Sequence, residues 1–140
     1  MLTDQAKELE LLIKARYPLL YIVSWDERRV EEMLRDVAAQ RQKRLFAWTV
    51  TQGIFALDTL QPTPVDPAAV NPMRALACVS ESREPAIYLF KDFHPFLLQN
   101  FMGDGPTEAI QIVRKLRDLA RELKRSEKTL VFLSPLLRLP

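Results

Sequence analysis

Blocks of apolar and polar residues along the chain predict helices and strands in turn. Between Leu2 and Ile13 the apolar residues recur at helical spacing, so an amphipathic helix is expected there. The continuous apolar run from Leu19 to Val23 is typical of a strand that is covered on both faces. A second helix follows, and its apolar side includes the residues from Val30 to Val37 that recur three and four apart.

Three further apolar runs predict strands. They are Leu45 to Val50, which a turn at Gly53 follows, Ala86 to Phe90, and Leu130 to Leu133. Strands that are apolar throughout and alternate with helices are typical of a parallel sheet with helices on both faces. We therefore expect an α/β fold with a parallel four-stranded sheet.

The segment between the second and third expected strands contains four prolines from Pro62 to Pro72 and is predicted to be an irregular loop. A short helix is expected at its end, with Asn71 as the N-cap and Pro72 as the first residue. The longest helix of the chain is predicted to begin near Asp104 and to end at about Lys124.

The composition is that of a single globular domain spanning residues 1–140. Hydrophobic residues make up 48% of the chain and charged residues 27%, which argues against disorder. A net charge of +2 provides no strong overall attraction to nucleic acid or to a membrane. Cys78 is the only cysteine, so no intramolecular disulfide can form, and its apolar neighbours predict a small buried residue. No apolar run approaches the length of a membrane span, and a cytoplasmic protein is expected.

The turn after the first expected strand lacks the residues of a phosphate-binding loop. Such a loop needs glycines, so that backbone N–H groups can converge on the anion, and a Lys-Ser/Thr pair. Here Trp25, Asp26 and Glu27 fill the turn with bulk and negative charge. Ser24 and Glu27 fit a capping box, so the turn is interpreted as a helix start in an architecture that resembles a nucleotide-binding fold without its Walker A loop.

Three polar residues near the ends of the later strands are candidates for catalysis. Asp92 follows an apolar strand, where a P-loop protein places the carboxylate that holds magnesium through water. His94 lies among aromatic residues, which is more typical of a packed residue than of a base. Ser134, His94 and Asp92 could form a triad, but no nucleophile-elbow pattern supports one. No cluster of cysteines and histidines predicts a metal site.

The last helix carries a basic stripe that is a candidate interaction surface. Asp118 and Glu122 lie on its edge and can pair with arginines three and four residues away. The stripe is either a surface for anions or a partner, or a solvated face whose basic end complements the helix dipole, and the second interpretation is favoured. Nucleic-acid binding would gain from neighbouring aromatic residues, and this helix has none. The stripe consists of Arg114, Arg117, Arg121, Lys124, Arg125 and Lys128.

Five segments resemble the N-terminal region of an uncharacterised AAA+ ATPase family that is encoded in cyanobacteria and in some algal plastid genomes. They are Glu10 to Arg29, Trp48 to Gly53, Tyr88 to Phe96, Ile112 to Leu123 and Lys128 to Pro135. In that family the region precedes a complete AAA+ domain. The resemblance implies that residues 1–140 are the N-terminal domain of a longer AAA+ protein, either a cloned domain or a truncated relative, with a link to photosynthetic organisms and with the plastid stroma as a second expected compartment.

The resemblance also implies roles for particular positions. Asp92 takes a vestigial Walker B-like place and Ser134 a vestigial sensor-like place. If the four strands are numbered in chain order, the implied sheet order is 1-4-3-2, which leaves the strand from Leu19 to Val23 at an edge. An apolar edge invites pairing with another chain, so self-association through this strand is expected.

These observations favour a non-catalytic domain that binds a partner or substrate or regulates an AAA+ core. The chain itself is expected to be no enzyme and to have no catalytic, cofactor-binding or metal-binding residues, whereas ATP and magnesium would belong to the AAA+ core. Its expected partners are that core and an unknown protein, and no membrane. The alternative is a nucleic-acid-binding module that uses the basic stripe. A small enzyme that uses Asp92 and His94 is a third hypothesis.

Overall fold

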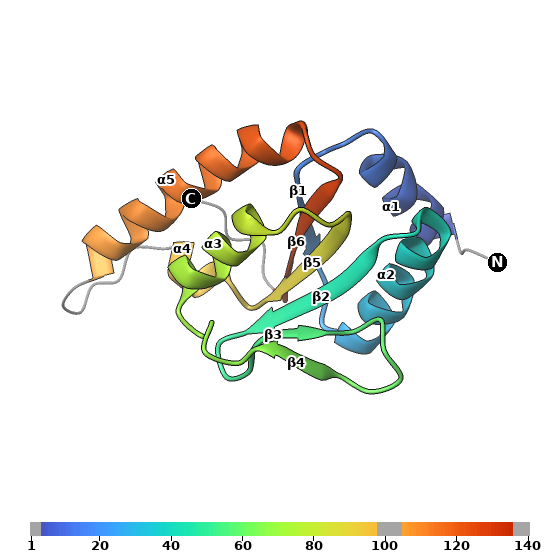
Figure 1. The fold of residues 1–140 in the computed structure, drawn as a ribbon, viewed down its shortest axis with the longest axis horizontal. Coiled ribbons are helices and arrows are strands. Elements are labelled where there is room, and N and C mark those ends of the chain that lie inside the picture. Colours follow the sequence, from blue (N-terminus) through green and yellow to red (C-terminus); the bar gives the residue numbers. More distant parts are fainter. Residues whose placement is uncertain (1–3, 98–104, 136–140) are drawn as a thin grey trace.

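One sheet with helices on both faces forms the fold of the residues that the computed structural model describes, 4–97 and 105–135 (Figure 1). The helices are α1 (Asp4–Lys14), α2 (Glu27–Arg41), α3 (Pro72–Glu81), α4 (His94–Leu97) and α5 (Gly105–Lys124). The strands are β1 (Leu19–Val23), β2 (Arg44–Thr49), β3 (Gly53–Ala56), β4 (Thr63–Asp66), β5 (Ala86–Lys91) and β6 (Lys128–Ser134).

The four strands that the sequence predicts are parallel and lie in the expected order. In the described residues the sheet order is β1-β6-β5-β2-β3-β4, and its first four members correspond to the predicted order 1-4-3-2. β1 pairs with β6, and β5 lies between β6 and β2. The carboxyl ends of these strands therefore meet at one edge of the sheet, which is where α/β proteins most often bind ligands.

The prediction of a four-stranded parallel sheet is wrong, because the sheet is mixed and contains six strands in the described part of the chain. β3 and β4 are antiparallel and extend the sheet beyond β2. Gly53 enables the turn between β2 and β3, since its φ is +70° and an added Cβ would lie 2.4 Å from the carbonyl oxygen of Asp66. Pro64 is tolerated because β4 is the outermost strand, where a missing N–H need not break a ladder bond.

The helices form two layers, one on each face of the sheet (Figure 1). α1 and α2 pack on the face that carries Leu20, Ile22 and Leu133. α3 and α5 cover the opposite face, which carries Leu19 and Phe132. Both faces of the parallel strands are thus buried, which explains why these strands are continuous apolar runs in the sequence.

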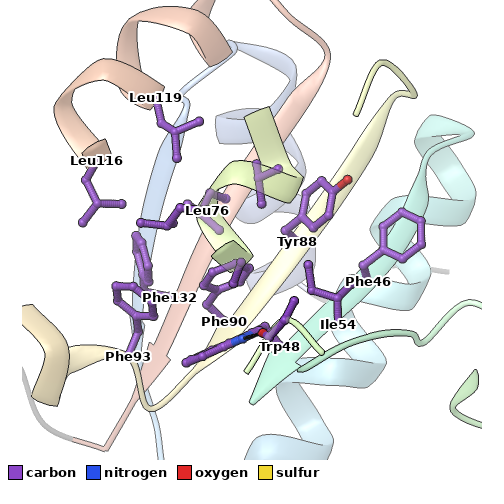
Figure 2. Close-up of a cluster of buried hydrophobic side chains, with 14 of the residues drawn as sticks. Phe46, Trp48, Ile54, Leu76, Tyr88, Phe90, Phe93, Leu116, Leu119 and Phe132 are labelled. Atoms are coloured by element: carbon purple, nitrogen blue, oxygen red, sulfur yellow. Dashed lines mark hydrogen bonds between the residues drawn. The ribbon is translucent and has the colours of Figure 1, made fainter. Parts of the chain in front are cut away.

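An aromatic cluster anchors the segment that follows β5 (Figure 2). The ring of Phe93 lies 5.3 Å from that of Trp48 and 5.4 Å from that of Phe132, measured between centroids. Trp48 is fully buried, and its indole Nε1–H donates a hydrogen bond of 2.6 Å to the carbonyl of Ala69. Because Phe93 is held in the core, the polar residues on either side of it, Asp92 and His94, are held at the carboxyl ends of the strands.

Candidate functional site

The turn between β1 and α2 forms a helix cap, but a different residue from the predicted one provides it. The N-cap is Asp26, whose Oδ1 accepts a hydrogen bond of 3.1 Å from the backbone N–H of Arg29. Ser24 instead accepts a hydrogen bond from the N–H of Asp26 through its Oγ, at 3.0 Å. The backbone N–H of Ser24 still donates to the carbonyl of Ser134, so Ser24 continues the ladder between β1 and β6 and lies too early to cap the helix.

An ion cluster lies at the N-terminus of α2. The ammonium group of Lys91, the last residue of β5, lies 2.5 Å from a carboxylate oxygen of Glu31 and 3.2 Å from one of Glu27. The Lys91 side chain is only 12% exposed, so the pair with Glu31 is well shielded from water. Sequence reasoning missed Lys91, because its partners are about sixty positions earlier in the chain and only the sheet brings them together.

This cluster lies at the N-terminus of α2, and a phosphate-binding loop presents its N–H groups at a helix end of this kind. The side chains of Asp26 and Glu27 already complement the positive end of the α2 dipole. A phosphate group here would meet these carboxylates, and the neighbouring cation Lys91 is already paired with Glu27 and Glu31. The local chemistry therefore disfavours an anion at this turn.

Asp92 and Ser134 both lie at the carboxyl edge of the sheet, but they differ in exposure. Asp92 is exposed and has a φ of +54°, a conformation that aspartate tolerates better than most residues, and its N–H donates to the carbonyl of Leu133. Ser134 is 1% exposed, and its Oγ lies 3.0 Å from Nδ1 of His94. A nucleophile must reach its substrate, so the buried Ser134 hydroxyl fits a structural contact better than a catalytic one.

The basic stripe is formed by α5 and the turn after it. Arg114 pairs with Asp118 at 2.8 Å, which confirms one of the ion pairs expected from the helical spacing. Glu122 instead accepts a hydrogen bond of 2.7 Å from the hydroxyl of Ser80 on α3. Within the described residues, four exposed members of the stripe form no ion pair: Arg117, Arg121, Lys124 and Arg125.

Lys128 does not belong to this exposed surface, which corrects the prediction. It is the first residue of β6 and is 8% exposed. Its ammonium group donates to the carbonyls of Val79, Ser80 and Ser82 at 2.6, 3.2 and 2.5 Å, and so caps the C-terminus of α3. Burial lowers the pKa of Lys128 below its usual value, and the charge of Glu122 opposes this effect.

A basic groove lies between the α1–β1 connection and the C-terminal half of α5. We define it by Arg16, Tyr17, Arg121 and Lys124, which line it together with small apolar residues. Tyr17 is 53% exposed. The helical pattern predicted Arg121 and Lys124, but no local signal connected them to Arg16 and Tyr17, which are about a hundred positions earlier.

The described residues offer little support for a metal site. No group of three or more histidines, cysteines, aspartates and glutamates there could hold a metal ion.

Cys78 is partly buried, and its thiol donates a hydrogen bond to Asp66 at 3.3 Å. Burial, aided by Asp66, raises the pKa of this thiol to about 11, which makes it a poor nucleophile. Among the described helices, none has the length and apolar character needed to span a membrane.

Comparisons with known proteins find a matching family model and several similar proteins. The family model described as "SpoVK-like AAA ATPase, N-terminal domain" matches residues 5–140. The chain is 34% identical over 136 residues to the "Uncharacterized AAA domain-containing protein ycf46" of Trieres chinensis, covering 95% of this chain and 24% of that protein. It is 31% identical to the protein of the same name from Guillardia theta, covering 96% of this chain and 24% of the relative. The chain thus spans about a quarter of the length of these relatives.

Proposed function

Because this chain belongs to the family of SpoVK-like AAA ATPase N-terminal domains, we propose that it is a non-catalytic domain that binds a partner or substrate or regulates an AAA+ core. ATP and magnesium are then the ligands of that core and not of residues 1–140. The observation that carries this proposal is the ion cluster of Lys91, Glu27 and Glu31, which takes the place that a nucleotide phosphate would need.

Two further features support a binding role over a catalytic one. Under this proposal Asp92 and Ser134 take vestigial Walker B-like and sensor-like places, and the burial of Ser134 against His94 supports a structural role for its hydroxyl. In contrast, α5 presents cations that have no acidic partner within the described residues and are free to bind a ligand. Recognition through α5 needs no rearrangement of the core.

Calorimetric titration of the 140-residue chain with ATP and magnesium tests the non-catalytic part. We expect no binding heat, because carboxylates and bulky side chains face the α2 N-terminus. A Glu27→Gln/Glu31→Gln variant is the matched control: it should also fail to bind, since removing charge does not create a glycine-rich cradle. Micromolar binding of ATP by the unmodified chain would overturn the proposal.

A second candidate function, nucleic-acid binding, is favoured by one observation. Tyr17 lines the same groove as Arg121 and Lys124, so the structure places an exposed aromatic ring beside the basic stripe. This function predicts affinity for single-stranded RNA or DNA that falls steeply with salt and weakens when Arg114, Arg117 and Arg121 are changed to alanine. The absence of binding to either nucleic acid at low salt would exclude it.

A further inference from the structure

Strand β1 presents one side of its backbone away from the sheet. The N–H of Leu130 donates to the carbonyl of Pro18, and the N–H of Ser24 donates to the carbonyl of Ser134, so the even-numbered residues face β6. Successive residues of a parallel strand turn their N–H and C=O groups to opposite sides. The backbone groups of Leu19 and Val23 therefore point away from β6, and within the described residues no strand pairs with that side.

The two faces beside this open edge differ in chemistry. On the α1–α2 face, a cleft at the end of β1 is lined largely by apolar side chains, among them Leu12, Ile22 and Met33. Glu8 and Arg29 also line this cleft, and their opposite charges cancel. On the α5 face, at the start of β1, lies the basic groove of Arg16, Tyr17, Arg121 and Lys124.

The cations of the basic groove have no carboxylate partner. In the described part of the chain, Arg16, Arg121 and Lys124 form neither an ion pair nor a side-chain hydrogen bond. These three cations lie beside the start of the edge where the backbone groups of Leu19 and Val23 face away from β6, and they complement a strand that carries acidic groups. An added strand would direct alternate side chains to the two faces, about 7 Å apart on each.

We infer that the β1 edge binds an extended peptide segment of a partner protein that alternates apolar and acidic residues. Its backbone extends the sheet next to β1, its acidic side chains enter the basic groove, and its apolar side chains enter the cleft between α1 and α2. This inference rests on the proposed binding function and names the class of partner.

The same observations disfavour two other occupants. A second copy of β1 would offer the side chains of Leu-Leu-Tyr-Ile-Val, which include no carboxylate for the basic groove. A nucleic acid could pair its phosphates with the cations, but it would leave the backbone edge at Leu19 and Val23 and the apolar cleft unfilled.

Fluorescence anisotropy with a labelled eight-residue peptide of alternating valine and glutamate, blocked at both ends, tests the inference on the 140-residue chain. We expect saturable binding, and none for the same peptide with lysine in place of glutamate. Val23→Pro removes an outward N–H but no bond to β6, and it should weaken binding about fivefold, the effect of one backbone hydrogen bond. Val23→Thr keeps that N–H and should bind normally.

A pair of variants on one helix tests the basic groove. Arg121→Glu should weaken peptide binding by about tenfold or more, because it replaces attraction with repulsion at the groove. Arg117→Glu changes the net charge equally, but Arg117 is absent from the groove lining, so its effect should be less than about threefold. Circular dichroism of each variant verifies that the fold is retained.

Several results would overturn the inference. They are failure of the acidic peptide to bind, equal effects of Arg117→Glu and Arg121→Glu, and normal binding by a folded Val23→Pro variant. A dimer in sedimentation experiments that Val23→Pro converts to a monomer would assign the edge to a second copy instead. The ATP titration is independent of these results, so the inference can fail while the non-catalytic role stands.

Discussion

The Nζ atom of Lys91 lies 3.2 Å from Oε1 of Glu27, although the two residues lie at the ends of β5 and β1, which are not neighbours in the sheet. Lys91 ends β5, Glu27 begins α2 directly after β1, and β6 lies between those strands. A cation from one strand end thus neutralises the acids that begin the neighbouring helix. The charges at the N-terminus of α2 are therefore paired within the protein.

Replacing Lys91 with methionine should destabilise the protein. Glu27 and Glu31 would remain close together with no cation between them, and we expect a loss of about 1–3 kcal/mol in the free energy of unfolding. Urea denaturation measures the change. The control is Arg28→Met on the same helix, whose pair with Glu32 is exposed and should contribute no more than about 0.5 kcal/mol. A loss for Lys91→Met of no more than about 0.5 kcal/mol would show that the cluster is not stabilising.

The substitution Lys128→Met should also destabilise the fold. It removes the ammonium group that binds three carbonyls at the end of α3, and a cost of about 1–3 kcal/mol is expected for the carbonyls left without a donor. Lys124→Met, at an exposed position of α5, should change stability by less than about 0.5 kcal/mol. Thermal unfolding of both variants distinguishes a buried cap from a surface charge. If Lys128→Met left the stability unchanged, the capping role of Lys128 would be contradicted.

The Cys78 thiol should react slowly at neutral pH and faster as the pH approaches 11. Its pKa is raised from 9.0 to about 11 by burial and by Asp66. The rate of alkylation by iodoacetamide as a function of pH measures this value. Asp66→Asn should lower the pKa and speed the reaction, because it removes the negative charge that disfavours the thiolate.

The same raised pKa predicts the sign of a stability change. The folded state holds the Cys78 proton more tightly than the unfolded state, so this contribution to stability is fully present below about pH 9 and is lost as the pH rises through about 11. The difference in unfolding free energy between the unmodified chain and Cys78→Ser should therefore shrink across this range. A difference that does not vary with pH would contradict the assignment.

Gly53→Ala should weaken the pairing of β3 with β2 and β4. The positive φ of Gly53 is unfavourable for alanine, and its Cβ would meet the backbone carbonyl of Asp66 at 2.4 Å, so we expect a cost of about 1–3 kcal/mol. Val50→Ala, an exposed change in the same turn, should cost less than about 0.5 kcal/mol. Chemical denaturation compares the two, and a Gly53→Ala protein of normal stability would show that the loop can move aside.

Local pattern was a good guide to some parts of the fold and a poor guide to others. The N-cap at Asn71 with Pro72 at the first position of α3 is confirmed, because a cap depends on residues within one turn. The hairpin of β3 and β4 was missed, because the prolines of that segment indicate a loop unless the strand lies at an edge. Edge position is a property of the whole sheet and cannot be read from the four residues of β4.

The sequence by itself determined the alternation of helices and parallel strands, since apolar runs and helical spacing specify which residues must be buried. The family resemblance supplied the order of the four parallel strands. Only the tertiary structure decided which charged residues meet. It joined Lys91 to Glu27 and Glu31, buried Lys128 under α3, and placed Arg16 and Tyr17 beside Arg121. These pairs join residues that are far apart in the chain. The packing of the hydrophobic core determines the distances between their charged groups, so the sequence pattern alone does not reveal them.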